Sequence, residues 1–218
     1  GHVLSTAVGD SVATFTPQVF GKYFLVDKIA TGGMAEIFKA KTYSHGGFEN
    51  LLVIKRILPH IGENDDFIEM FIDEAKVSVA LQHPNIVRIY DFGKIHDNYF
   101  IAMECVDGKD ARNVLRQMAR RRHFMPPRYC AYIALETCKG LAYAHAKGDL
   151  QGNPYGIVHR DISPSNVIVS YEGEVKIADF GIAKAKSNAY QTRDGVLKGK
   201  FEYMSPEQAT RKEIDQRS

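Results

Sequence analysis

The chain has 218 residues, 44% of them hydrophobic and 25% charged, and its 28 basic and 26 acidic side chains leave a formal net charge of +2. This length excludes a small disulfide-stapled protein, the composition disfavours a disordered chain, and the near-neutral charge disfavours a nucleic-acid-binding surface. The three cysteines lack the spacing of a metal site, which favours reduced thiols, and no apolar run is long enough to predict a membrane segment in this chain.

Residues 1–21 show no sustained hydrophobic period, and we expect them to form a flexible leader. Between Tyr23 and Ala40, apolar residues alternate on either side of a Gly-rich turn, which predicts a β-hairpin. Phe67–Leu81 carries apolar residues at helical spacing and is predicted as an amphipathic helix. Further strands are predicted at Leu51–Ile57, Ile86–Phe92 and Tyr99–Cys105. Residues 22–103 are therefore expected to form a small lobe of five antiparallel strands and one helix.

The pattern changes after residue 109. The apolar spacing predicts helices at Ala111–Arg121 and Pro127–Lys147. Short strands are predicted at Ile157–Val158, Val167–Val169 and Val175–Ala178. Residues 110–218 should therefore form a second, mainly helical lobe, and the predicted fold class is α+β with two lobes.

Four separated signals follow one another in this chain: a Gly-rich turn within Ile29–Phe38, Lys55 on the next strand, the polar loop His159–Asn166, and Asp179. Phosphoryl transfer needs such parts, because it depends on positioning phosphates, neutralising their charge and orienting a nucleophile. Each signal alone has an ordinary explanation, such as a plain hairpin turn or a surface lysine. Together, in this order and at these spacings, they are hard to explain by chance.

The acidic and amide side chains among these signals suit a metal ion. Asp161 and Asn166 lie in a polar loop that leads into an apolar strand, and Asp179 follows. Two carboxylates and an amide at one pocket match the oxygen ligands that Mg²⁺ prefers. Lys55 lies among apolar residues and needs an anionic partner, which Glu74 in the middle of the predicted helix can supply. A solvated helix acid is an equally ordinary interpretation of Glu74.

On these motifs, the sequence from Tyr23 to its last residue resembles the catalytic domain of the eukaryotic-like, or Hanks-type, serine/threonine protein kinases of bacteria. The resemblance implies a two-lobed kinase fold with residues 104–109 as the hinge between the lobes. It also implies ATP and Mg²⁺ as cofactors, a protein substrate, and transfer of the γ-phosphoryl group to serine or threonine hydroxyls. Autophosphorylation is expected as well.

Roles for individual residues follow from the same resemblance. Lys55 would hold the α- and β-phosphates and pair with Glu74, and Asp161 would orient the substrate hydroxyl and accept its proton. Asn166 and Asp179 would bind the metal ions. The implied nucleotide contacts are Ile29, Ala30, Gly32, Gly33, Met34, Ile37, Val53, Lys55, Met103, Glu104, Val106 and Ile168.

Within this set, Met103 resembles the gatekeeper residue, and Glu104–Val106 resemble the hinge whose backbone bonds the adenine edge. Two differences from the family pattern predict weaker nucleotide binding. Ala30 and Ala35 stand where the family has loop glycines, and alanine disfavours the positive φ that glycine allows. Val53 replaces a smaller alanine and should narrow the adenine pocket.

A paired departure concerns the transferring phosphate. The family places a lysine two residues after the catalytic aspartate, where this chain has Ser163, and a threonine later in the chain, where this chain has Lys200. We hypothesise an exchange in which Lys200 supplies the positive charge and Ser163 supplies the hydroxyl. The residues leave open the alternative that Lys200 is exposed to solvent and the phosphate is less well neutralised.

The region after Asp179 carries candidate phosphorylation sites. Ser205–Glu207 matches the element that closes the activation segment in the family. Upstream of it, Thr192 is our first candidate and Ser187 the second, and the guanidinium of Arg160 would bind the added phosphate. An unmodified polar loop is the alternative.

The resemblance also implies that the large lobe is incomplete. The run that ends at Ser218 matches the residues just before the family's central buried helix, so we expect an uncovered apolar face that could support self-association. The alternative function is therefore a nucleotide-binding pseudokinase, or an inactive kinase fragment with a regulatory or interaction role. The protein is expected in the cytoplasm, and a longer parent protein could be anchored to a membrane.

Overall fold

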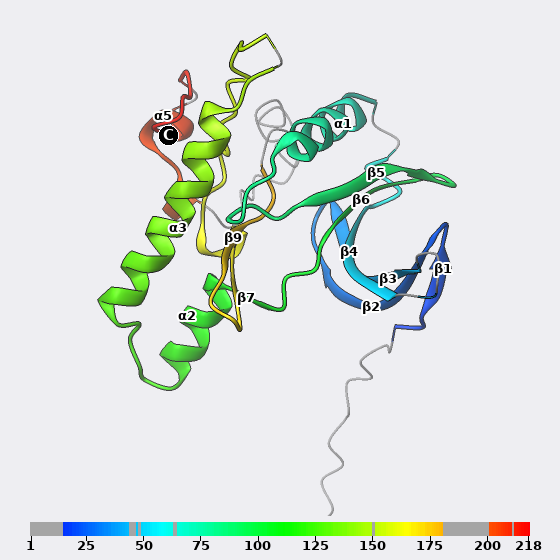
Figure 1. Cartoon of the computed structure of the whole chain (residues 1–218), viewed down its shortest axis with the longest axis horizontal. Coiled ribbons are helices and arrows are strands. Elements are labelled where there is room, and N and C mark those ends of the chain that lie inside the picture. The colour runs from blue at the N-terminus through cyan, green and yellow to red at the C-terminus, as the bar shows by residue number, and fades with distance from the viewer. Residues whose placement is uncertain are drawn as a thin grey trace, which may run out of the picture.

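The structure, a computed structural model, has two lobes joined by a short linker after residue 104 (Figure 1). It describes residues 15–43, 47, 49–62, 65–149, 151–180, 201–210 and 212–218. Within these residues, the first lobe holds a curled, antiparallel, six-stranded sheet of order β1-β2-β3-β4-β6-β5. Its strands are β1 (Gln18–Phe20), β2 (Tyr23–Thr31), β3 (Ala35–Tyr43), β4 (Glu49–Ile57), β5 (Ile89–Ile95) and β6 (Asn98–Glu104).

The predicted hairpin is confirmed as β2 and β3, with the Gly-rich turn between them. Gly32 N donates to Ala35 O at 2.8 Å and closes this turn. Along the two strands, inward-facing Leu25 and Phe38 are buried and pack with Phe100 of β6 in one apolar cluster. The alternation read from the sequence is therefore the alternation between the core face and the solvent face of the sheet.

The sheet has one strand more than predicted, because β1 lies in the segment expected to be a flexible leader. Phe20 is 5% exposed and packs edge-on against Phe100, with ring centroids 5.5 Å apart. The guanidinium of Arg56 also lies over the Phe20 ring. These partners are distant in sequence, so the short segment has no recognisable pattern of its own. Residues 1–14 lie outside the described residues.

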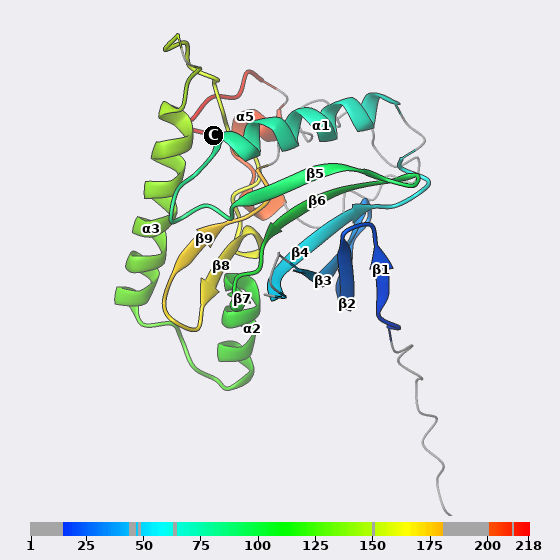
Figure 2. The same cartoon turned by 45° about the vertical axis from the view of Figure 1, so that its right-hand side comes forward.

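Helix α1 (Asp65–Ala80) lies over one face of the sheet, along β5 (Figure 2). Ile68, Phe71 and Ala75 are buried in a cluster that includes Ile57 and Ile101 of the sheet. Their spacing of three and four residues puts them on one side of the helix, which confirms the predicted amphipathic helix.

The second lobe combines a three-stranded sheet, of order β7-β8-β9, with helices. Its elements are β7 (Gly108–Asp110), α2 (Ala111–Arg120), α3 (Pro127–Ala146), the 3-10 turn η1 (Pro164–Asn166), β8 (Val167–Ser170), β9 (Val175–Ile177), the 3-10 turn η2 (Phe201–Tyr203) and α5 (Pro206–Ala209). The two long helices confirm the predicted ones. None of the helices among the described residues is long and apolar enough to cross a membrane.

The strand predicted at Ile157–Val158 is wrong. Residues 155–159 have irregular backbone in the described structure. Ile157 is nevertheless 4% exposed and packs with Ala144 of α3 and with Phe180. Its apolar side chain is therefore buried by helix packing, which a short apolar pair in the sequence does not distinguish from strand pairing. The predicted α+β class with two lobes is confirmed by the remaining elements.

Strand β9 is bonded to both lobes. Val87 N, between α1 and β5, donates to Ile177 O, and Ile177 N donates to Asn85 O, each at 2.8 Å. In the linker region, Lys176 Nζ lies 2.9 Å from Oε1 of Glu104 at the end of β6. The chain that leaves β9 is therefore held at the boundary between the lobes.

A charged ladder braces the strands beneath the Gly-rich turn. Lys28 of β2 and Arg56 of β4 both donate to Glu36 of β3, at 2.5 and 2.7 Å. Burial alone would raise the pKa of the Glu36 carboxyl, but these two hydrogen bonds outweigh burial and hold the pKa below its usual value. The ionised carboxylate therefore stabilises the fold.

Replacing this carboxylate should give a pH-dependent loss of stability. Because the pKa of Glu36 is lowered by folding, its contribution is complete above the unfolded-state pKa of about 4.3 and disappears as pH falls through the folded-state value. Glu36→Gln should cost about 1 kcal/mol at pH 7 and less at pH 3, measured by thermal unfolding across that range. Glu172→Gln, on an exposed turn, is the matched control. A pH-independent difference would contradict this interpretation.

Candidate active site

Lys55 and Asp179 meet at the boundary between the lobes. Strand pairing places Lys55 of β4 opposite Ile37 on one side and Ile101 on the other. Its Nζ lies 2.8 Å from Oδ1 of Asp179, which follows β9. The Lys55 side chain is 19% exposed and that of Asp179 is 44% exposed, so the ion pair opens to solvent and is accessible to a ligand. The predicted pairing of Lys55 with Glu74 stays a prediction, because the Glu74 side chain lies outside the described residues.

The side chain of Asp161 is held by Asn166, at the end of the same loop. Asn166 ends η1, and its Nδ2 donates both to Asp161 O and to Asp161 Oδ2, each at 2.8 Å. The backbone of Asn166 is fixed in turn, because its carbonyl accepts from Ala178 N at 2.9 Å. The structure therefore brings the Asp161–Asn166 pair next to the segment that carries Asp179.

His159 orients this loop, a role that the sequence reasoning did not assign. Its side chain is buried, at 2% exposure, and its ring centroid lies 4.6 Å from that of Phe180. Asp161 N donates to His159 Nδ1 at 3.3 Å, so the ring proton belongs on Nε2, which lies 3.1 Å from Ala178 O. The imidazole thus bridges two backbone groups. The only sequence signal for this role is its position two residues before Asp161.

Apolar residues predicted to contact the nucleotide lie together beneath the Gly-rich turn. Met103 is buried in the cluster of the first lobe, and Val53, Val106 and Ile168 pack against that cluster as partly buried side chains. The turn above is open, because Ile29, Gly33 and Met34 are exposed. Ala30 and Gly32 are exposed as well, and Ile37 is half-buried. This arrangement offers an apolar wall for a base and a polar backbone edge for phosphates.

The side chain of Glu104 has a structural role at the linker. Its carboxylate pairs with Lys176 and accepts from Arg88 N at 3.1 Å. A nucleotide contact at Glu104 would therefore use its backbone, as predicted. Burial raises the pKa of the neighbouring Cys105 thiol, which favours its protonated form.

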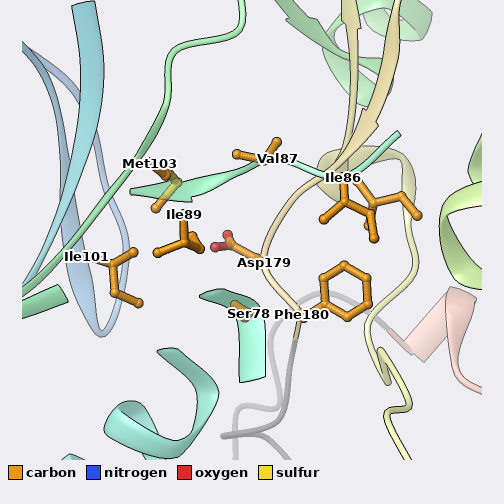
Figure 3. Close-up of a pocket in the computed structure, with 9 residues that line it drawn as sticks. Ser78, Ile86, Val87, Ile89, Ile101, Met103, Asp179 and Phe180 are labelled. Atoms are coloured by element: carbon orange, nitrogen blue, oxygen red, sulfur yellow. The ribbon is translucent and has the colours of Figure 1, made fainter. Parts of the chain in front are cut away.

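A small cavity lies behind Met103 and next to Asp179 (Figure 3). Its volume is about 20 Å³, comparable to the space of one water molecule. Figure 3 shows the Asp179 carboxylate pointing toward Ile89, while the Phe180 ring points away on the side of Ile86. The two neighbours thus divide their roles, with Asp179 facing the candidate site and Phe180 facing the core.

Of the remaining predicted site residues, Ser163 is described and the others are not. Ser163 is 3% exposed, and its hydroxyl lies 3.4 Å from that of Ser165. Lys200, Thr192 and Ser187 lie outside the described residues. The exchange of roles between Ser163 and Lys200, and both candidate phosphorylation sites, therefore stay predictions.

The protein kinase domain family matches residues 23–218. The chain belongs to this family. Its similarity extends to bacterial kinases: it is 49% identical over 201 residues to tyrosine-protein kinase MasK of Myxococcus xanthus, covering 92% of this chain and 31% of that protein. It is 34% identical over 194 residues to serine/threonine-protein kinase PknA of Mycobacterium tuberculosis, covering 87% and 42%.

Solved kinase domains share the fold. The crystal structure of the Mycobacterium tuberculosis PknI kinase domain matches with a TM-score of 0.66 at 28% identity, covering 92% of this chain and 70% of that chain. The chain spans less than half the length of the two curated relatives named above. The implied bacterial protein kinase family is therefore confirmed, while the roles of individual residues stay predictions.

The Gly-rich turn permits a test of phosphate contact that does not disturb folding. A Cβ at Gly33 would meet nothing within 4 Å of the described structure, and the φ of Gly33 is not left-handed. Gly33→Ala should therefore keep or slightly raise the melting temperature. It should raise KM for ATP by about 3- to 10-fold if the Gly33 backbone approaches phosphate, equivalent to losing one hydrogen bond. Gly93→Ala, with ordinary contact at 3.6 Å, is the control, and equal KM values would contradict the assignment.

Proposed function

We propose that this chain is the catalytic part of an ATP- and Mg²⁺-dependent protein kinase that transfers the γ-phosphoryl group to serine or threonine hydroxyls of protein substrates. One observation supports this most strongly. The Lys55–Asp179 ion pair joins residues 124 positions apart. Ala178, the neighbour of Asp179, donates its N–H to Asn166 of the hydrogen-bonded Asp161–Asn166 pair. A lysine cation, a partly exposed carboxylate and a hydrogen-bonded carboxylate near the boundary between the lobes support this assignment.

The donor set fits a hard divalent cation. Asn166 uses its amide nitrogen on Asp161, and this orientation leaves its amide oxygen as a ligand. The partly exposed Asp179 offers a carboxylate near it, and both are oxygen donors of the kind that Mg²⁺ prefers. Asn166 and Asp179 would hold the metal, which when bound supplies positive charge to the phosphates.

The other roles concern this chain's own side chains. Lys55 would exchange part of its contact with Asp179 for the α- and β-phosphates of ATP. Asp161 would accept the hydrogen bond and then the proton of the substrate hydroxyl, while Asn166 holds the carboxylate in one rotamer. The cluster around Val53, Met103 and Ile168 would exclude water from the base.

The proposed activity can be tested by intact-mass spectrometry after incubation with Mg²⁺ and ATP. We expect the wild type to gain phosphoryl groups. Asp161→Asn should react at least about 100-fold more slowly, because this variant loses the proton acceptor but keeps the shape of the side chain. Chelation of the metal by EDTA should abolish the gain. If neither the wild-type chain nor an added protein substrate is phosphorylated, the proposal is contradicted and the pseudokinase alternative is favoured.

The chemical class of the accepting hydroxyl is a separate question. Several relatives carry serine/threonine kinase names, including PknA and PrkC, whereas the 49% identical relative is named a tyrosine-protein kinase. This name makes phosphorylation of tyrosine the second candidate. Phosphoamino-acid analysis of the same reaction decides between them, and we expect phosphoserine or phosphothreonine.

The hypothesised exchange between Ser163 and Lys200 has its own test. If Lys200 brings the positive charge to the transferring phosphate, Lys200→Met should lower kcat by about 100-fold and leave ATP binding unchanged. Lys198→Met, two residues away, removes the same charge and is the matched control. Equal turnover of the Lys200 variant and the wild type would overturn the exchange.

We also propose autophosphorylation at Thr192 or, second, at Ser187. Arg160 supports this, because its Nε is buried and has no hydrogen-bond partner among the described residues. A phosphate would supply the charged acceptor that such a guanidinium nitrogen needs. We further propose a cytoplasmic location, with ATP and a protein substrate as partners. Self-association through an uncovered face of the second lobe stays a prediction.

A further inference from the structure

Gln208 links the short helix α5 to the loop that carries Asp161. Its Nε2 donates to the carbonyl oxygen of Arg160 at 2.8 Å, across 48 residues of sequence. The other side of the same amide, Oε1, accepts from Ser205 N at 3.0 Å. Ser205 Oγ accepts in turn from Gln208 N at 3.3 Å, which completes a capping box. One side chain therefore caps its own helix and holds a distant loop.

The orientation of this amide is determined by its neighbours. Ser205 N can only donate and Arg160 O can only accept, so the amide oxygen must face Ser205 and the amide nitrogen must face Arg160. A flipped amide would lose both bonds. A glutamate at this position could keep the bond from Ser205, but its second oxygen would oppose the Arg160 carbonyl.

The hydrogen bond from Gln208 acts on the peptide group that precedes Asp161. This peptide group is held at both ends, because its carbonyl accepts from Gln208 and its N–H donates to His159 Nδ1. Arg160 has a φ of 64°, a left-handed conformation that costs a non-glycine residue energy. Such a conformation persists only where surrounding contacts hold it. Rotation of this peptide group would swing the Cα of Asp161 and its carboxylate.

We propose that Gln208 is a positioning residue for phosphoryl transfer, which makes the orientation of Asp161 depend on the docked segment 201–210. This inference rests on the proposed kinase function and adds a residue to it. Gln208 does not contact reacting atoms; it fixes the backbone from which Asp161 projects. Through this hydrogen bond, the conformation of the catalytic loop depends on whether α5 is docked.

Gln208→Glu in the full-length protein is the central test, because it changes one NH₂ group to oxygen and keeps the shape. We expect kcat to fall by about 10- to 100-fold, while KM for ATP stays within about 2-fold. Gln117→Glu, on the exposed side of α2, introduces the same charge and should leave kcat unchanged. Ser205→Ala removes the hydroxyl cap but keeps the bond to Arg160, so it should lower the melting temperature with little effect on kcat.

The pH profile separates positioning from general damage. Once protonated, the carboxyl introduced by Gln208→Glu regains a donor for the Arg160 carbonyl, so the ratio of variant to wild-type kcat should rise as pH falls. Gln208→Met lacks a donor at every pH and should show the same loss without this recovery. A flat ratio for the glutamate variant, or a kcat within about 2-fold of wild type, would overturn the proposal.

Hydrogen exchange provides a readout that does not need activity. Deuterium uptake by the peptide containing Asp161 should increase in Gln208→Glu, relative to wild type and Gln117→Glu, because the bonded peptide group is released. Unchanged uptake, or equal increases in Ser205→Ala and Gln208→Glu, would assign Gln208 to helix capping alone and overturn its positioning role. If the wild type lacks kinase activity, the proposed function fails, whereas the exchange experiment still decides the role of Gln208.

Discussion

Five consecutive residues, Lys176–Phe180, are the constraint on which the rest of this structure depends, because together they contact the linker, both lobes and the polar loop. Lys176 pairs with Glu104, and Ile177 bonds the backbone of Asn85 and Val87. Ala178 bonds Asn166 and His159, Asp179 pairs with Lys55, and Phe180 packs on the ring of His159. These partners belong to the linker, both lobes and the polar loop. A shift of this segment by one residue would exchange core-facing and site-facing side chains, and every one of these contacts would be lost together.

The segment makes all of these contacts because it leaves the strand conformation at Asp179. Up to Ile177 the chain is a strand whose side chains alternate, and Lys176 and Ile177 accordingly turn to the linker and to the core. Asp179 has a φ of 56°, which breaks the alternation and brings its carboxylate to Lys55. A left-handed aspartate costs about 1 kcal/mol, and the charged hydrogen bond to Lys55 offsets that cost. Without this ion pair, the strained conformation would have less support, so the geometry of the site and the docking of the lobes are coupled.

Much of the fold could be predicted from local pattern, because the hairpin, α1 and the two long helices bury one face of a regular element. Two predictions failed where burial depended on distant partners. Strand β1 contributes a single buried residue, Phe20, whose contacts come from Arg56 and Phe100. Ile157 shows the reverse case, since its apolar character reflects packing on α3 and not a strand.

In the candidate site too, some residues could be predicted from the sequence, whereas others depend on distant partners. Lys55, Asp161 and Asn166 could be identified because the chemistry requires those side chains at those spacings. The structure then adds Asp179 as a direct partner of Lys55. His159 and Gln208 could not be assigned, because their roles are hydrogen bonds to backbone groups, and any residue supplies a carbonyl or an N–H. Residues that position a backbone leave no complementary side chain in the sequence to mark them.

Arg160 offers two points at which the polar loop that carries Asp161 can be held, its carbonyl and its guanidinium. Its carbonyl is held by the neutral amide of Gln208, so the influence of the segment 201–210 is geometric and insensitive to salt. Its guanidinium Nε is buried without a partner among the described residues, so it can donate to an added acceptor, and a charged acceptor would bind most strongly. The two act on opposite ends of one strained residue. An anion at the guanidinium would therefore restrain the same backbone that Gln208 holds, and the two effects on Asp161 should reinforce each other, beyond simple addition.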